Sequence, residues 1–203
     1  METITKGCTR CEIDKPLSEF SNAKATNDGK MYVCKQCNRE INHEWRKTPS
    51  GIYTNIKSRQ THYKKHEHWR YKPVNMTRTE FIDWWTSQEP KCFYCGIHSN
   101  ELSLVEDTQN TKATRMTVDC IENSKGYSLD NIVLACGRCN FIKNDFFTHD
   151  DMVIIGRDYV APKWRKMLEQ TITAEVNEAV EKEFSLTPSY NSLSETVKEG
   201  GEE

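Results

Sequence analysis

Eight of the nine cysteines in this chain form four Cys-x-x-Cys pairs, and this spacing restricts the possible fold more than any other feature. Two such pairs joined by a loop supply four thiolates in an arrangement that suits tetrahedral Zn²⁺. A site filled by four cysteines keeps no position for water, so we expect both ions to be structural, with iron in a rubredoxin-like site as the alternative. The first set is Cys8, Cys11, Cys34 and Cys37, and the second is Cys92, Cys95, Cys136 and Cys139.

Composition favours metal ligation over disulfides. Only 36% of the 203 residues are hydrophobic, and small domains with thin cores often depend on a structural metal. The chain begins without the apolar segment of a secretory signal, so we expect a cytoplasmic location, where thiols stay reduced. No apolar run approaches the ~18 residues that cross a bilayer, so we expect no membrane partner.

The net charge is -2, but the charged residues are distributed unevenly along the chain. Residues 39–78 carry ten basic and three acidic side chains, whereas residues 161–203 carry five basic and nine acidic ones. Basic groups neutralise phosphates, and interleaved aromatic rings can pack on sugars or bases. We expect contact with nucleic acid within 52–72, and the alternative is the solvated face of an amphipathic helix. The candidate contacts are Lys57, Arg59, Lys64, Lys65, Arg70 and Lys72.

Three helices are predicted outside the cysteine-rich regions. Thr77 and Glu80 have the spacing of a capping box and predict a helix within 76–90. Thr148 predicts the start of a second helix over about 149–159. Apolar residues near helical spacing predict a third over 163–183, and the polar, acidic end of the chain is expected to be disordered.

The most informative stretch lies between the second pair of cysteine knuckles. Residues 116–120 and 132–135 have the character of short strands, and a helix is expected to open at Cys139 and Asn140. Asp119 lies at the end of the first strand, and Asn140 lies at the start of the helix. A carboxylate and an amide oxygen are hard ligands that suit Mg²⁺.

These motifs resemble the HNH (ββα-metal) endonuclease family, and in particular its zinc-pinned members from phages and mobile elements. Over residues 91–148 the pattern runs Cys-x-x-Cys, Val-Asp-x-Ile, Gly-Tyr-x-x-Asp-Asn and Cys-x-x-Cys-Asn-x-x-Lys. Residues 6–40 are similar to an accessory zinc ribbon of such phage proteins. The resemblance implies an α+β fold of small zinc-stabilised modules, with a ββα-metal core and flanking helices. It also implies the cytosol of a bacterial host if a phage encodes the chain.

The resemblance also implies roles for single residues. Asp119 and Asn140 would hold a catalytic Mg²⁺ or Mn²⁺ against the scissile phosphate, and Asn131 would orient the loop of the active site. The family has a histidine as general base directly after the aspartate, but this chain has Cys120. A thiol with a pKa near ~8.5 is mostly protonated at neutral pH, so Cys120 acts as the catalytic base only if its pKa is lowered. Otherwise His98 or His149 replaces the base, the cation activates its own water without one, or Cys120 is an inert buried residue.

The sequence thus leads to one preferred function and two alternatives. The preferred one is an HNH-type endonuclease that hydrolyses duplex or branched DNA with a divalent cation. The first alternative is a catalytically degenerate HNH-fold protein that binds nucleic acid or a protein without cutting, and the second is a pair of protein-interaction zinc ribbons. The predicted regions are a zinc ribbon (1–40), a basic helical linker (41–90), an HNH-like domain (91–160) and a C-terminal helix with an acidic tail (161–203).

Overall fold

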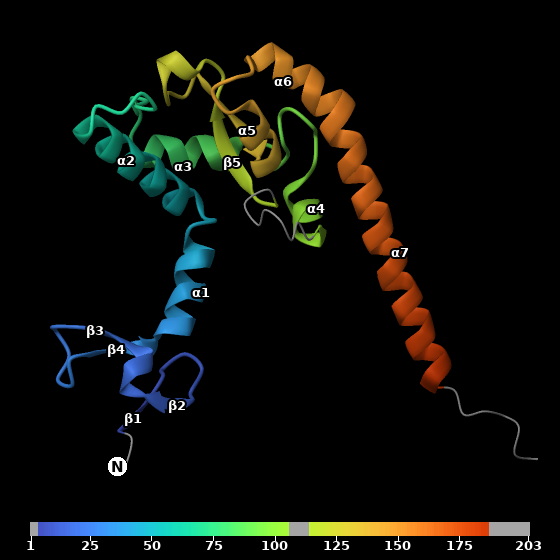
Figure 1. Ribbon diagram of the computed structural model, residues 1–203. Coiled ribbons are helices and arrows are strands. Elements are labelled where there is room, and N and C mark those ends of the chain that lie inside the picture. Colours follow the sequence, from blue (N-terminus) through green and yellow to red (C-terminus); the bar gives the residue numbers. More distant parts are fainter. Residues whose placement is uncertain (1–3, 106–113, 187–203) are drawn as a thin grey trace, which may run out of the picture.

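The computed structural model describes residues 4–105 and 114–186, so the predicted acidic tail lies outside the described residues (Figure 1). The fold is of the predicted α+β class, and the described residues form three two-stranded antiparallel sheets with helices around them. The strands are β1 (Thr5–Gly7), β2 (Asp14–Pro16), β3 (Phe20–Asn22), β4 (Lys30–Cys34), β5 (Met116–Cys120) and β6 (Ile132–Cys136). The helices are α1 (Lys35–Trp45), α2 (Pro49–Lys65), α3 (Arg78–Ser87), α4 (Ser99–Leu104), α5 (Gly137–Lys143), α6 (His149–Ile155) and α7 (Ala161–Leu186).

The N-terminal part consists of two hairpins, β1–β2 and β3–β4, followed directly by α1. Its small core contains Phe20, which is buried among the cysteines of the first set. Cys34 ends β4 and also caps α1, because its sulfur accepts a hydrogen bond from the backbone amide of Cys37 at 3.5 Å. Helix α1 therefore runs through residue 40, and the division of the chain into four regions stays a prediction.

The ββα unit consists of β5, β6 and α5. The two strands pair in register from Met116 opposite Cys136 to Cys120 opposite Ile132, which confirms both predicted strands. Cys136 ends β6, and its sulfur caps α5 by accepting a hydrogen bond from the amide of Cys139 at 3.4 Å. This cap starts the helix at Gly137, two residues before the predicted start.

Both cysteine sets close into clusters that could hold zinc. Within each set the four sulfur atoms lie within 4.8 Å of one another, although the sets join segments far apart in sequence. Backbone hydrogen bonds, first from Cys11 and then from Cys34, lower the pKa of Cys8 to about 6. In the second cluster a hydrogen bond from Cys136 lowers the pKa of Cys92. The shift is not shared by all the thiols, since burial raises the pKa of Cys37 to about 12 and hydrogen bonding with Cys136 raises the pKa of Cys139. It is the close grouping of four sulfur atoms that suits a bound cation.

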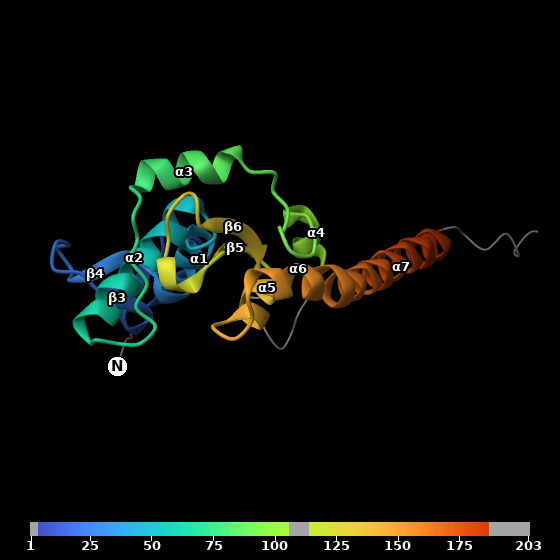
Figure 2. The ribbon, with the colours of Figure 1, turned by 90° about the horizontal axis from the view of Figure 1, so that it is seen from above.

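Two apolar clusters hold the ββα unit in place. One surrounds the second cysteine set and includes Tyr94, Met152 and Trp164. It therefore joins the turn between Cys92 and Cys95 to α6 and α7. The other places Val118 and Ile132 against the side chains of α2 and α3, around the fully buried Phe81. Figure 2 shows α3 crossing above the β5–β6 hairpin, as this packing requires.

Gly126 fixes the loop between β5 and β6 against the segment that follows α2. Its φ of +73° is favourable only for glycine, and a Cβ at this position would overlap Pro73. Val74 and Tyr127 form a parallel bridge at the same point. The end of the basic segment is thereby attached to the ββα unit.

The predicted helices are confirmed, with one difference in their boundaries. Helix α3 begins with the predicted capping box of Thr77 and Glu80, and α6 begins at the predicted cap Thr148. A single π-helical segment, Gly156–Val160, joins α6 to α7 without a break, although the sequence predicted two separate helices. Among the described residues no helix is both long and apolar enough to span a membrane.

We expect two zinc ions per chain, and we expect the Cys139→Ser variant to retain only one. A structural zinc contributes about 10–16 kcal/mol to folding in small modules, which exceeds the stability of most domains, so the ββα unit should unfold. Elemental analysis and thermal unfolding followed by circular dichroism measure both effects. The control is Cys120→Ser, because Cys120 lies in neither cluster and its removal should leave two ions bound. Equal zinc content in both variants would contradict this assignment.

Candidate functional site

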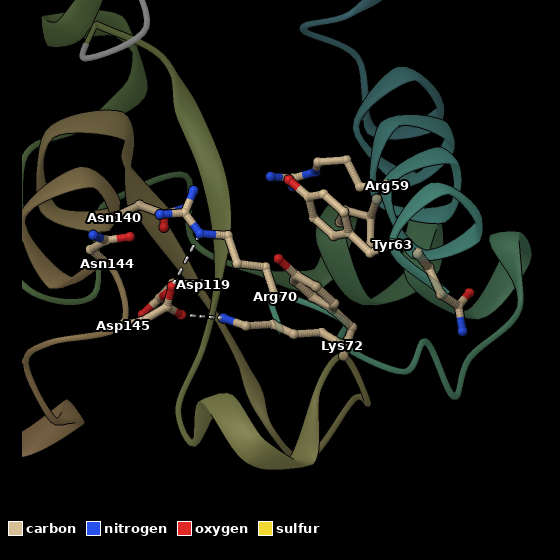
Figure 3. A pocket seen from close by; sticks show the side chains of 11 residues that line it. Arg59, Tyr63, Arg70, Lys72, Asp119, Asn140, Asn144 and Asp145 are labelled. Carbon is tan, nitrogen blue, oxygen red and sulfur yellow. Dashed lines mark ion pairs between the residues drawn. The ribbon is translucent and has the colours of Figure 1, made fainter. Parts of the chain in front are cut away.

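A polar cavity of about 150 Å³ lies between the ββα unit and the basic segment. Asp119 and Asn140, the two predicted ligands of the divalent cation, both line it. Figure 3 shows them on one side of the cavity, with Arg59 and Tyr63 projecting from α2 on the other side. The remaining lining residues are Ile56, Gln60, Arg70, Lys72, Tyr127, Asn144 and Asp145.

The position of Asp119 follows from the alternation of side chains along β5. Val118 packs into the apolar cluster with α2 and α3, so Asp119 points to the other face of the hairpin, toward α5. It is only 5% exposed. Asn140 approaches the same point from α5, where its amide nitrogen donates to the hydroxyl of Thr117 at 2.9 Å and to the carbonyl of Val118 at 3.0 Å.

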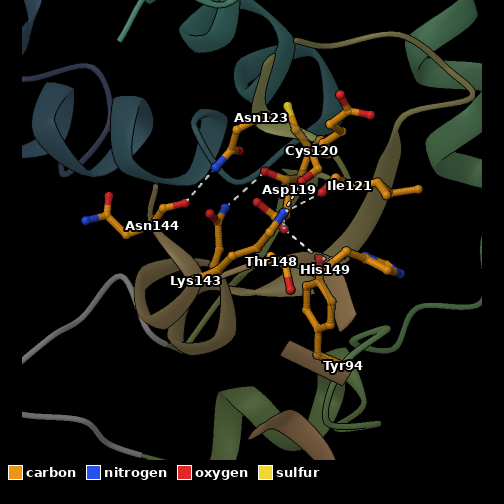
Figure 4. Close-up of polar contacts among 12 residues, drawn as sticks. Tyr94, Asp119, Cys120, Ile121, Asn123, Lys143, Asn144, Thr148 and His149 are labelled. Atoms are coloured by element: carbon orange, nitrogen blue, oxygen red, sulfur yellow. Dashed lines mark hydrogen bonds and ion pairs between the residues drawn. The ribbon is translucent and has the colours of Figure 1, made fainter. Parts of the chain in front are cut away.

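One oxygen of Asp119 is held by two buried donors (Figure 4). The ammonium of Lys143 lies 2.8 Å from Oδ2, and the hydroxyl of Tyr94 donates to the same oxygen at 2.7 Å. Lys143 also donates to the backbone carbonyls of Cys120 and Ile121. Its side chain is 1% exposed, which a lysine tolerates only with such partners.

The partners of these groups leave two oxygens available. Within the described parts of the chain, Oδ1 of Asp119 and Oδ1 of Asn140 accept no hydrogen bond, and both residues line the cavity. A carboxylate and an amide oxygen at one cavity fit a small, hard divalent cation that keeps several waters. The donor set is therefore compatible with Mg²⁺ or Mn²⁺.

Cys120 does not face this cavity. It is 1% exposed, and its alternation along β5 places it on the side of Val118, near Tyr127. Burial raises the pKa of its thiol to about 11, so the thiol is protonated at neutral pH. A buried, protonated thiol cannot accept a proton from water, which agrees with the expectation of an inert residue.

The two histidines considered as substitutes lie in different places. Nδ1 of His98 lies 2.7 Å from Oδ1 of Asn100 at the start of α4, and His98 does not line the cavity. His149 opens α6, and its Nδ1 lies 3.2 Å from the hydroxyl of Tyr94. His149 is thus linked to Asp119 through one intervening side chain and does not contact the cavity directly.

Asn131 lies outside the cavity and organises the loop that precedes it. The residue is 5% exposed. Its amide nitrogen donates to the carbonyls of Glu122 and Gly126 at 2.9 and 2.7 Å, and its oxygen accepts from the amide of Glu122 at 3.0 Å. These contacts span the loop from β5 to β6, so Asn131 would act on the site through the backbone.

Only part of the basic segment reaches the site. Arg59, Arg70 and Lys72 line the cavity, whereas Lys57, Lys64 and Lys65 do not. The ammonium of Lys72 lies 3.4 Å from the carboxylate of Asp145, and the guanidinium of Arg70 lies 3.8 Å from it. Asp145 follows α5, so these pairs connect the basic segment to the helix that carries Asn140.

Three residues of this arrangement were not assigned a role from the sequence. Lys143 stands three residues after Asn140, at the last position of the motif Cys-x-x-Cys-Asn-x-x-Lys, and this helical spacing could have indicated a shared face. Asp145 stands two residues after Lys143 in the sequence. Tyr94 stands between two zinc-spaced cysteines, and no local pattern there indicates that its hydroxyl reaches β5.

Comparisons with known proteins give one likeness. Among solved structures the chain is similar to the rare-cutting HNH restriction endonuclease PacI, whose structure is described as showing a mechanism of DNA perturbation. The identity is 23%, the TM-score is 0.44, and the match covers 79% of this chain and 96% of PacI. No family model and no curated protein matches the sequence. A likeness of this size assigns no function to the chain.

We expect Lys143→Met to lower the free energy of unfolding by about 3–5 kcal/mol, because it leaves the buried carboxylate of Asp119 without its cation. Chemical denaturation measures the change. Lys125→Met is the matched control, since it breaks an exposed ion pair with Glu122 and should leave stability nearly unchanged. Similar losses in the two variants would show that the buried pair has no special structural importance.

Proposed function

We propose that this chain is a metal-dependent phosphodiesterase, and specifically an HNH-type endonuclease that acts on DNA. The observation that carries the proposal is the cavity itself, which is lined by Asp119, Asn140 and three basic side chains, two of them paired with Asp145. Oxygen ligands suit the cation that such hydrolysis uses, and basic groups suit the phosphates on either side of the scissile bond. The ββα order of the hairpin and helix agrees with the family that the sequence motifs resemble.

Asp119 and Asn140 would hold Mg²⁺ or Mn²⁺ in this proposal. When bound, such a cation polarises a phosphoryl oxygen and lowers the pKa of water. Lys143 and Tyr94 keep Oδ2 of Asp119 engaged, so that Oδ1 is directed to the cavity. Fixing a ligand through its second oxygen in this way typically affects metal affinity by about 10–100-fold.

Positive charge continues beyond the cavity and supports a polyanionic substrate. Burial lowers the pKa of Arg115, and the charges of Arg59 and Arg46 lower it further, so Arg115 experiences the positive field of both. These three arginines come from the end of α1, from α2 and from the residue before β5. Cationic groups that repel one another are stabilised by phosphates, whereas a neutral partner would leave this repulsion in place.

Cys120 favours a second candidate function, which is binding of nucleic acid without cleavage. A general base contributes typically about 10²–10⁴-fold, and the protonated thiol of Cys120 supplies none of this. The cation sites and the basic side chains suffice for binding in this case. Both candidate functions use the same surface, but only the endonuclease forms cleavage products.

The first test is cleavage of duplex, nicked and branched DNA by the purified chain with Mn²⁺. We expect Asp119→Asn to abolish cleavage, because the variant loses the negative charge of the proposed ligand. The variant keeps a hydrogen-bond acceptor for Lys143. The matched control is Asp130→Asn, because Asp130 is exposed in the loop between β5 and β6 and does not line the cavity. Products that persist in Asp119→Asn would rule out this site, and absence of products from the wild type would favour binding alone.

The second test places an imidazole at position 120, where the family has its base. Imidazole accepts a proton near neutral pH, but position 120 faces away from the cavity, so we expect Cys120→His to leave the cleavage rate unchanged. A rise of about 10²-fold or more would contradict this placement. Zinc content and the unfolding temperature report whether the larger side chain is accommodated, with Cys120→Ser as the control. If both variants stay folded and cleave like the wild type, while Asp119→Asn is inactive, the base lies elsewhere, and His149→Ala then tests the link through Tyr94.

A further inference from the structure

The C-terminal half of α7 extends away from the rest of the molecule. Trp164 is 4% exposed and anchors the start of the helix in the core around the second cysteine set. Beyond this anchor, Ile172, Val176 and Val180 are 52%, 55% and 46% exposed. Figures 1 and 2 both show the helix running outward past α4, with its last turns against no other described element.

This half of the helix has little intrinsic stability. β-Branched residues disfavour helix, and isolated helices shorter than ~12–15 residues are marginal in water. Five of the ten residues from Thr171 to Val180 are Thr, Ile or Val. A helix of this composition needs a packing partner, and large apolar side chains at regular spacing indicate where the partner lies.

The exposed apolar residues share one face of α7 with two charges at its ends. Positions 165, 168, 172, 176 and 180 follow at intervals of three or four, and position 183 continues the series. Arg165 stands at one end of this face and Glu183 at the other, and both are exposed. Residues 165 and 183 are 18 positions apart, which is five full turns at 3.6 residues per turn. We call this surface the α7 stripe; it comprises Arg165, Leu168, Ile172, Val176, Val180 and Glu183.

We propose that the α7 stripe binds the same stripe of a second copy of this chain, with the two helices antiparallel. A two-fold axis near residue 174 places Arg165 opposite Glu183 twice and encloses the apolar residues between these pairs. Ile172 then faces Val176 at the centre of the pair. Val180 approaches the exposed part of Leu168, whose remaining surface packs against the core around the second cysteine set. A parallel pair would instead place Arg165 against Arg165 and Glu183 against Glu183, which is unfavourable.

The charges of the whole helix agree with this direction. Its first turns carry Lys163, Arg165 and Lys166, and no acidic residue precedes Glu169. Its later part is acidic, with Glu175, Glu178, Glu181 and Glu183 against Lys182. Antiparallel pairing brings the basic part of each helix toward the acidic part of the other over about 27 Å of helix. The stripe is narrow, so we expect a reversible dimer.

The test is sedimentation of the full chain over a concentration series, with two matched variants. Val176→Glu places a charge in the centre of the stripe and should leave the protein monomeric. Ala174→Glu places the same charge on the opposite face of the same helix and should still form the dimer. Neither residue contacts the core, so zinc content and circular dichroism should be unchanged in both. A monomeric wild type, or equal dissociation of both variants, would overturn the proposal.

Charge exchange tests the direction of pairing. Arg165→Glu and Glu183→Arg should each raise the dissociation constant by about tenfold, because each turns two attractive contacts into repulsive ones. The double variant should restore the wild-type constant. In a parallel pair the single variants would change nothing, since like charges already face each other, and that result would overturn the antiparallel arrangement.

Discussion

The closure of the second cysteine cluster is the interaction on which the rest of the structure depends. Cys136 is the last residue of β6, the cap of α5 and a member of the cluster. One residue therefore fixes where the strand stops, where the helix starts and the angle between them. Asp119 and Asn140 reach the same cavity only because this junction holds β5 and α5 together. The candidate site is thus built on a position that a metal in this cluster would fix.

Local sequence patterns predicted those strands and helices that neighbouring residues indicate. The strands around Asp119 and the helix caps at Thr77 and Thr148 were found because each depends on neighbouring residues. Helices α1 and α4 were missed. Helix α1 starts at a cysteine cap, which resembles a metal knuckle in the sequence and carries no separate helix signal. The junction of α6 and α7 was also missed: the prediction ended one helix at 159 and began the next at 163, whereas the π-helical segment Gly156–Val160 continues α6 directly into α7.

The sequence analysis brought Asp119 and Asn140 together at one candidate site but missed the residues that support them. Asp119 and Asn140 could be placed together because the order of strand and helix brings them to one point. Tyr94 and Lys143 reach Oδ2 of Asp119 from a knuckle and from the end of a helix, and such contacts across the fold leave no trace in local spacing. The basic segment shows the same division: composition indicated its charge, but only the bridge at Val74 and the contact of Gly126 with Pro73 determine which basic groups face the cavity.

The ion pair between Lys143 and Asp119 also separates folding from the binding of a divalent cation. A buried carboxylate without a counter-charge would destabilise the domain until a cation arrived, and the protein would then be fragile wherever free Mg²⁺ is scarce. Lys143 supplies that counter-charge from within the chain. With the cysteine clusters filled, the domain could therefore reach its final form without a further cation. Under the proposed function, a divalent cation at Asp119 and Asn140 would then be an exchangeable reagent, able to enter and leave without unfolding the scaffold that receives it.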